Sequence, residues 1–251
     1  MLVTNDRRSD NSSVILFTNA RDEPNISEWI SHHLLLGFDK IIVFDHLSIT
    51  PISSTIHTNF NGRLDIIKVG GVGNIKLKLM EKAANIARNG NYSWMLYLDA
   101  DEFLNLNKFT NIKQPKGLIT ENFIRSEMRL DKHVKSFVRP STVVKVVNPH
   151  YYIISNSRRY YSANGTKMGM RPFNEQPLPF IKAYAYIAHF YTQSEEEHLR
   201  RKSRVMDDGT SNKASGLQEV HNIYNNVVNN QLQNKYSQKT KSFLKEHNIV
   251  L

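Results

Sequence analysis

Three carboxylates follow an apolar run in the segment YLDADEF, residues 97–103. Like charges this close repel each other unless a positive charge lies among them. In an extended segment, residues i and i+2 point to the same side, so Asp99 and Asp101 are expected to share one target while Glu102 turns away. Carboxylate oxygens in this arrangement suit Mg²⁺ or Mn²⁺. The alternative interpretation is a solvated acidic turn.

A histidine is the second candidate for metal chemistry. His189 lies near the end of the apolar run AYAYIAHFY, residues 183–191. A neutral imidazole there could complete the shell of a divalent cation, although a histidine on an apolar strand is more often a hydrogen-bonded core residue. His32 and His33 lie inside a predicted helix, and we interpret both as structural, with His33 partly buried.

The elements that must position these side chains alternate between strand and helix. Strands are predicted over 14–18, 40–45, 63–70 and 93–99, and helices over 25–37 and 74–90. Asn25 and Asn74 are the expected N-caps, and Gly37 is expected to end the first helix. This order predicts an α/β fold with a mixed, mostly parallel sheet flanked by helices.

The second half of the chain has a less regular pattern. Strands are predicted over 123–130, 135–140 and 183–191, and helices follow from Ser194 onward. We expect an N-terminal segment over 1–13, a single domain over 14–236 and a tail over 237–251.

Polar residues follow three of the four strands predicted in the first half. They are Asn19, Arg21, Asp22 and Glu23 after the first strand, Asp45 and Ser48 after the second, and the acidic triplet after the fourth. Ligands of open α/β sheets bind beyond the carboxyl ends of the strands. We therefore expect the three clusters to meet at one edge of the sheet.

Composition narrows the classes of protein. The 251 residues include no cysteine, which excludes disulfides, zinc–thiolate sites and thiol nucleophiles. The net charge of +10 is scattered and accompanies no nucleic-acid motif, so we expect a solvated basic surface and no nucleic-acid partner. The apolar run Val14–Phe17 is too short for a signal peptide or a membrane span. We therefore expect a soluble, cytoplasmic protein.

Four sequence blocks resemble the glycosyltransferase family 2-like and family 92-like proteins. In chain order they read ARDEPNISEWISHHLLLGFDKIIVFDHLS, WMLYLDADEF, KSFVRP and IAHFYTQSEEEHLRRKSR. The resemblance implies a GT-A fold and a nucleotide-sugar donor, usually UDP-linked. It also implies Mn²⁺ or Mg²⁺ bound by Asp99 and Asp101, with His189 as the third protein ligand.

The same resemblance implies a donor site in the first half of the domain. Its residues would be Thr18, Asn19, Ala20, Arg21, Glu23, Asp45, Ser48 and Asp99, together with Lys202 from the C-terminal part. Arg21 and Lys202 are candidates to offset charge on a leaving diphosphate. Residues 14–105 would form the donor half, 106–192 the acceptor half and 193–236 the C-terminal helices.

The acceptor side departs from the family pattern. Family members are usually inverting, which requires a carboxylate that deprotonates the acceptor hydroxyl. A W-x-x-F-G block is absent between the acidic motif and KSFVRP. Glu127, with Asp131 behind it, is our candidate base, and a solvated strand-edge acid is the competing interpretation. The sugar, the acceptor and the oligomeric state stay unassigned.

A metal-dependent glycosyltransferase is the leading functional prediction. A metal-dependent nucleotidyltransferase or phosphotransferase is the first alternative, because the same carboxylates can hold any metal-bound nucleotide. The segment VGGVGN, residues 69–74, lacks the Lys and Ser/Thr of a P-loop. The second alternative is a catalytically inactive basic protein that binds RNA or another anion.

Overall fold

The computed structural model describes most of the first half of the chain and parts of the second. The described residues are 13–71, 75–106, 112, 122–126, 130–155, 160, 185–190, 196–197, 199–200, 231–247 and 249. For residues 122–126, 130–134, 186 and 231–236, the backbone alone is described. No helix in these ranges is long and apolar enough to cross a membrane.

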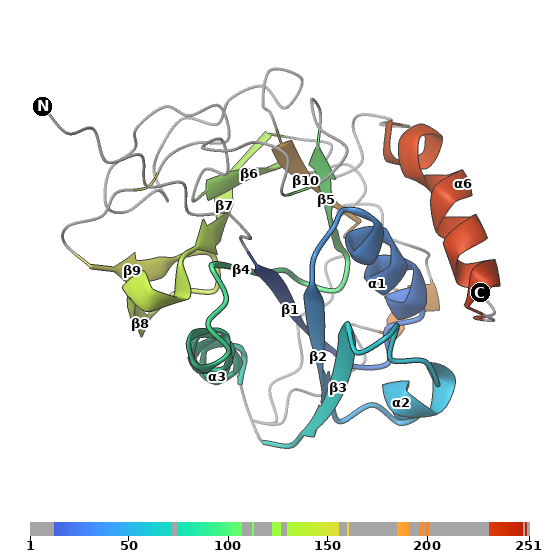
Figure 1. Cartoon of the computed structure of the whole chain (residues 1–251), viewed down its shortest axis with the longest axis horizontal. Coiled ribbons are helices and arrows are strands. Elements are labelled where there is room, and N and C mark those ends of the chain that lie inside the picture. The colour runs from blue at the N-terminus through green and yellow to red at the C-terminus, as the bar shows by residue number, and fades with distance from the viewer. Residues whose placement is uncertain are drawn as a thin grey trace, which may run out of the picture.

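Strands and helices alternate through the first hundred residues (Figure 1). The strands are β1 (Val14–Ala20), β2 (Lys40–His46), β3 (Leu64–Val69), β4 (Trp94–Tyr97), β5 (Glu102–Leu106), β6 (Asn122–Ser126), β7 (Leu130–Val138), β8 (Val143–Val146), β9 (Tyr152–Ile154) and β10 (Ala185–His189). The helices are α1 (Ile26–Leu35), α2 (Ile52–Thr55), α3 (Lys76–Asn89), the short 3₁₀ turn η1 (Pro140–Thr142) and α6 (Gln231–Glu246).

Eight strands form one mixed sheet in the order β3-β2-β1-β4-β7-β6-β10-β5. The four strands from β3 to β4 are parallel to one another, and β10 is parallel to β6. β7 runs antiparallel to β4 and β6, and β5 runs antiparallel to β10. This confirms the predicted mixed, mostly parallel α/β fold and is consistent with the GT-A fold that the resemblance implies.

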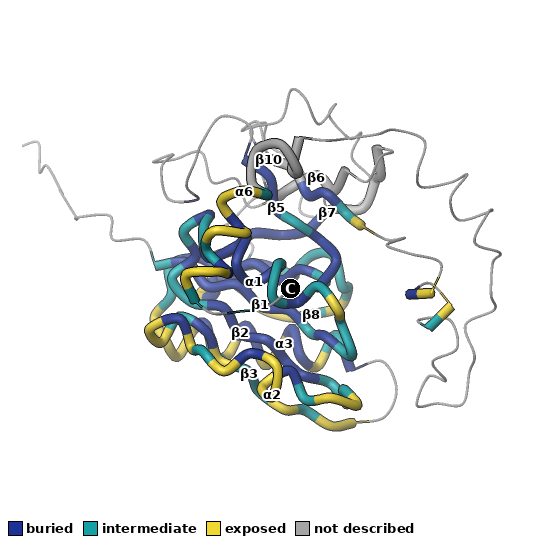
Figure 2. Tube along the Cα trace, turned by 90° about the vertical axis from the view of Figure 1, so that its right-hand side faces the viewer, coloured by how far each residue is buried: buried dark blue, intermediate teal, exposed yellow. Residues whose placement is uncertain are grey.

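The central strands are buried on both faces, as expected for strands covered by helices. Val14 and Leu16 of β1 pack in the core that includes α1, whereas Ile15 and Phe17 pack in the core that includes α3. Figure 2 shows these central strands in dark blue and the exposed residues around α2 in yellow. Strand alternation therefore sends successive residues of one strand toward different helices.

Helix α1 ends where the sequence predicts but begins without the predicted side-chain cap. Gly37 has a φ of 96°, and its N–H donates to the carbonyl oxygen of Leu34 at 3.1 Å. Asn25 occupies the N-cap position and makes no side-chain cap hydrogen bond, so that part of the prediction is wrong. Asn74, the predicted cap of α3, lies outside the described residues.

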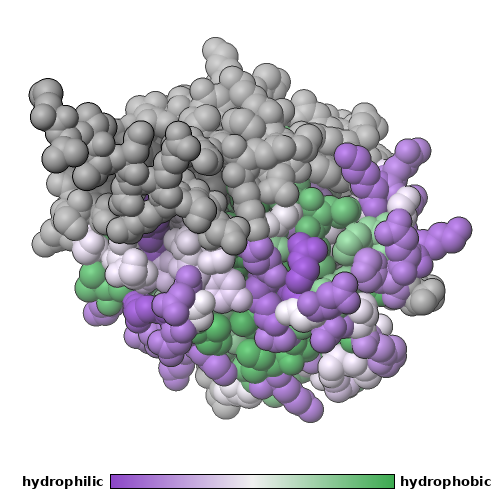
Figure 3. All heavy atoms as spheres, viewed as in Figure 1, coloured by the Kyte–Doolittle hydropathy of each residue, from purple (hydrophilic) through white to green (hydrophobic). Residues whose placement is uncertain are grey.

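The C-terminal helix continues past residue 236, into the segment predicted as a tail. It packs against α1, with Leu244 buried and the ring of Phe243 stacked on Phe60 at 5.6 Å between centroids. The remaining residues of this stretch are mostly polar, and Figure 3 shows hydrophilic side chains where α6 borders the view. Two apolar residues among the ten positions 237–246 are too sparse a pattern to predict an amphipathic helix.

Candidate functional site

The carboxyl ends of β1, β2 and β4 meet at one edge of the sheet, which confirms the predicted convergence. Ala20 at the end of β1 pairs in register with Asp45 of β2. On the other side of β1, Phe17 pairs with Tyr97, the last residue of β4. The polar residues that follow these strands therefore start from neighbouring positions, where ligands of α/β sheets bind.

Residues 99–102 form a tight turn and not the extended segment that the sequence suggested. The Glu102 N–H donates to the carbonyl oxygen of Asp99 at 3.0 Å, and the Asp99 N–H donates to Glu102 Oε2 at 2.9 Å. Two hydrogen bonds in opposite directions thus close the turn. Because it is not extended, the expectation that Asp99 and Asp101 share one target by strand alternation is wrong.

Asp99 lies between two lysine ammonium groups. Lys76, the first residue of α3, contacts Asp99 Oδ1 through its Nζ atom. Lys135 Nζ, on β7, lies 2.9 Å from Asp99 Oδ2 and 2.9 Å from Glu102 Oε2. The Lys135 side chain is 1% exposed. The positive charge that the acidic turn requires is therefore supplied, at least at Asp99 and Glu102, by side chains of the protein.

These contacts fix the charge states of the cluster. Burial of Asp99 disfavours its charged form, but Lys135 and Lys76 outweigh burial and hold the pKa of this carboxyl well below its usual value. Burial also opposes the charge of Lys135, yet Asp99 and Glu102 raise its pKa above the ordinary value. For Lys76 burial dominates, and its pKa is lowered despite the attraction of Asp99. Asp99 and Lys135 are therefore a charged pair at neutral pH.

Asp101 faces a different partner. Its Oδ1 lies 3.2 Å from His189 Nε2, and the two side chains are 10% and 4% exposed. His189 is opposite Glu102 in the β10–β5 ladder, and the Phe190 N–H donates to the Asp101 carbonyl oxygen at 2.8 Å. The strand ladder therefore holds the imidazole against the carboxylate that the sequence predicted as its partner.

The Asp101–His189 pair fits two ligands of one divalent cation. In an octahedral shell with ligands at about 2.1 Å, neighbouring ligand atoms are about 3 Å apart, close to the observed Oδ1 to Nε2 separation. Asp99 fits less well, because both of its oxygens contact ammonium groups. Among the described residues, no group of three or more acidic or histidine side chains is arranged to hold a metal. The three-ligand shell stays a prediction.

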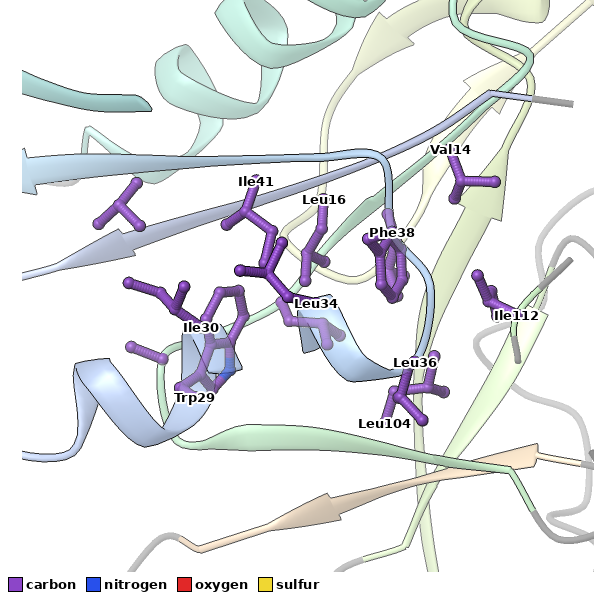
Figure 4. Close-up of a cluster of buried hydrophobic side chains, with 14 of the residues drawn as sticks. Val14, Leu16, Trp29, Ile30, Leu34, Leu36, Phe38, Ile41, Leu104 and Ile112 are labelled. Carbon is purple, nitrogen blue, oxygen red and sulfur yellow. The ribbon is translucent and has the colours of Figure 1, made fainter. Parts of the chain in front are cut away.

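Helix α1 fixes β5, the strand that carries Glu102, through ring nitrogens. Trp29 Nε1 donates to the Glu102 carbonyl oxygen at 2.8 Å, and His32 Nε2 lies 2.7 Å from the Leu104 carbonyl oxygen. The Leu104 N–H donates to His33 Nε2 at 3.2 Å. Figure 4 shows Trp29 and Leu104 within this core. β5 ends the sheet, so these rings satisfy backbone groups that lack a strand partner.

Both histidines of this contact are neutral. Because His33 Nε2 accepts a hydrogen bond, its proton resides on Nδ1, which donates to the Trp29 carbonyl oxygen at 2.8 Å. Burial lowers the pKa of His32 to about 4, and burial together with His32 lowers the pKa of His33 well below its usual value. The predicted structural role of both is confirmed, although His33 is fully buried and not partly so.

Two predicted donor-site side chains lie on opposite faces of the sheet. Asn19 accepts a hydrogen bond at Oδ1 from the Tyr97 hydroxyl at 3.1 Å. Asp45 accepts the Ile52 N–H at Oδ2 at 2.9 Å, which anchors the start of α2. Its other oxygen, Oδ1, is buried with no hydrogen-bond partner in the part of the chain that the structure describes. A buried acceptor without a hydrogen bond costs free energy, so a ligand that donates a hydrogen bond to this oxygen would gain affinity.

Asp22, which the donor-site prediction omitted, joins the loops that follow β1 and β2. Its backbone is left-handed, with a φ of 48°. The Asp22 N–H donates to Ser48 Oγ at 3.0 Å, and Asp22 Oδ1 accepts the Ile49 N–H at 2.6 Å. Arg200 donates to the Asp22 carbonyl oxygen and forms an ion pair with Glu197 at 2.6 Å. Ser48 therefore helps to shape this edge of the sheet through Asp22.

The other predicted donor residues lie close to this edge. Thr18 and Ala20 are buried near the end of strand β1, so their backbone can line a ligand but their side chains face the core. Arg21 and Glu23 are half-buried in the connection to α1. Lys202 lies outside the described residues, and its role stays a prediction.

The predicted catalytic base also stays a prediction. Glu127 lies outside the described residues. Asp131 lies on β7, four residues before Lys135, and its backbone alone is described. At the rise of an extended strand, this places the Asp131 backbone about 13 Å from that of Lys135.

Sequence reasoning missed the two lysines of the acidic turn. A lysine inside the strand-like segment KSFVRP was a usable signal, because a buried ammonium group requires a carboxylate partner. Lys76 gave a second signal, since a cation at the start of a helix opposes the helix dipole unless an acid compensates it.

Comparisons with known proteins give only remote likenesses. No family model matches the chain, and no curated protein matches it. Among solved structures, S. aureus TarS 1–349 aligns with a TM-score of 0.36 and 13% identity over 52% of this chain and 48% of that chain. HddC from Yersinia pseudotuberculosis aligns with a TM-score of 0.34 and 14% identity over 83% and 86%.

The chain thus spans about half the length of the TarS chain that it matches. Likenesses at this level do not bear on activity.

Proposed function

We propose that this protein is a glycosyltransferase that moves a sugar from a nucleotide-sugar, with UDP as the expected carrier, to an acceptor hydroxyl with inversion. The Asp101–His189 pair is the observation that carries the proposal. The pair is nearly buried, has the spacing of two ligands of one cation, and lies just beyond β4. Ligands of open α/β sheets bind at this edge. The four sequence blocks that resemble glycosyltransferases support the same assignment.

Asp101 and His189 would hold Mn²⁺ or Mg²⁺ in this proposal. When bound, such a cation supplies Lewis-acid stabilisation of the charge on a leaving diphosphate. The α1 side chains hold β5, whose first residue, Glu102, follows Asp101 in the chain and pairs with His189 in the strand ladder. This rigidity matters because a preorganised site does not have to reorganise during the reaction.

Two other positions have proposed roles in binding and proton transfer. The buried Oδ1 of Asp45 would accept a hydrogen bond from the nucleoside, which offsets the cost of an unpaired acceptor. Glu127 or Asp131 would take the proton of the acceptor hydroxyl as a general base. The acceptor itself stays open.

Titration of the purified protein with UDP tests the proposal. We expect Mn²⁺ to raise UDP affinity by about tenfold or more over EDTA, because a cation held by Asp101 and His189 would offset the charge of the diphosphate. Asp101→Ala and His189→Ala should remove this increment, whereas Asp65→Ala, at an exposed carboxylate of β3, should retain it. Equal UDP affinity in Mn²⁺ and EDTA would refute the assignment.

A turnover assay separates the two enzymatic alternatives. Release of free sugar from a UDP-sugar with Mn²⁺ favours a glycosyltransferase, whereas cleavage of ATP favours a phosphotransferase or nucleotidyltransferase.

A further inference from the structure

The two lysines at the acidic turn differ in what they can reach. Lys135 is 1% exposed and contacts both Asp99 and Glu102, so its ammonium group is enclosed by protein carboxylates. The Lys76 side chain is 21% exposed and contacts Asp99 from the start of α3. Lys76 is therefore the member of the pair that a ligand at this edge can touch.

The charges of the cluster leave Asp99 little capacity for a metal ion. Each Asp99 oxygen already contacts an ammonium group, and Glu102 shares the second of these. Asp101 is the remaining carboxylate of the turn, and it faces His189. Within the acidic motif, Asp99 thus pairs with lysines, whereas Asp101 is placed to bind a metal cation.

We propose that Lys76 binds the diphosphate of the donor directly, and that Asp99 positions the Lys76 ammonium group instead of serving as a metal ligand. This inference rests on the proposed function, because it assumes that a nucleoside diphosphate occupies the edge beside Asp101.

The size of the turn makes a shared ligand possible. Asp99 and Glu102 are the ends of a four-residue turn closed by a backbone hydrogen bond, so their Cα atoms are less than about 7 Å apart. Lysine is a common phosphate ligand because it is a compact charge on a flexible stem. A diphosphate at Asp101 would therefore lie beside the Lys76 side chain, which is 21% exposed and whose ammonium group Asp99 holds at the start of the turn.

Substitution of Lys76 tests the contact, with a neighbouring lysine as the control. Lys76→Met is expected to weaken UDP binding by about 10- to 100-fold, in Mn²⁺ and in EDTA alike, because a charged hydrogen bond to phosphate is lost. Lys78→Met removes the same charge from an exposed position of the same helix and should change UDP affinity by less than about twofold. Lys76→Arg should recover part of the loss.

Two further probes separate a phosphate contact from damage to the fold. Uridine, which lacks phosphate, should bind the wild type and Lys76→Met equally. Inorganic pyrophosphate, followed by ligand-observed NMR, should bind the wild type more tightly than Lys76→Met even in EDTA. Similar losses for Lys76→Met and Lys78→Met, or an equal loss of uridine binding, would overturn the proposal.

A separate measurement tests whether Asp99 is a metal ligand or a residue that positions Lys76. With saturating UDP, Asp99→Asn should leave the Mn²⁺ affinity measured by electron paramagnetic resonance within about twofold while weakening UDP binding, because its role is to hold Lys76. A loss of Mn²⁺ affinity as large as that of Asp101→Ala would show that Asp99 is a metal ligand. Lys76-dependent pyrophosphate binding without UDP binding would contradict the proposed function but not the role of Lys76.

Discussion

Protonation of His32 should detach α1 from the strand that follows the acidic turn. The ring of His32 is buried and is hydrogen-bonded to the Leu104 carbonyl oxygen at 2.7 Å. Burial lowers its pKa from 6.5 to about 4. Between pH 6.5 and 4, His32 is protonated in the unfolded chain but stays neutral in the folded protein. The contribution of neutral His32 to the free energy of unfolding is therefore fully present above pH 6.5 and is lost as the pH falls toward 4.

The lowered pKa of His32 sets the size of the effect. A difference of about 2.5 pKa units at about 1.4 kcal/mol per unit corresponds to a loss of about 3 kcal/mol in the free energy of unfolding across this window. His33, whose pKa is also lowered, adds a loss of the same sign. A loss of this size is a large fraction of the stability of an ordinary domain.

Urea unfolding followed by circular dichroism at pH 7 and pH 4.5 measures this loss. His32→Gln keeps a donor for the Leu104 carbonyl oxygen but cannot titrate, so its stability should fall by about 2 kcal/mol less than that of the wild type. His57→Gln, at an exposed position, should behave as the wild type does. Parallel pH profiles for the wild type and His32→Gln would show that His32 is not buried as a neutral ring.

Two further substitutions test the supports of the acidic turn. Lys135→Met leaves Asp99 and Glu102 without their shared cation and should lower the free energy of unfolding by about 3 to 5 kcal/mol, measured in urea; a loss below about 1 kcal/mol would contradict the buried pair. Trp29→Phe removes the indole hydrogen bond to the Glu102 carbonyl oxygen and should cost about 1 to 3 kcal/mol in the same assay. An unchanged midpoint would mean that this bond contributes nothing.

The sheet was predictable because its central strands leave a local signature. Segments such as Val14–Ala20 and Lys40–His46 are short apolar runs, and helical spacing separates them. The continuation of the C-terminal helix past residue 236 was not predictable in the same way, because this part of the helix depends on packing Phe243 and Leu244 against distant elements. Sequence periodicity shows which face of a helix or strand is apolar. It does not show which distant element packs against that face.

The sequence predicted which acidic and histidine residues belong to the candidate site, but not all of the contacts between their side chains. Asp101 and His189 were expected together, and they lie together. The partners of Asp99 are 23 and 36 residues away in the chain, so no local pattern connects them to it. The turn itself depends on Glu102 reaching back to the Asp99 N–H, a contact that strand alternation cannot anticipate.

The position of Mn²⁺ in crystals grown with UDP is the most direct test of the proposed function. We predict an anomalous peak that contacts both Asp101 Oδ1 and His189 Nε2, with the diphosphate oxygens completing its shell. A peak bound by Asp99 in place of the lysines, or UDP bound with no Mn²⁺ beside Asp101, would contradict the account.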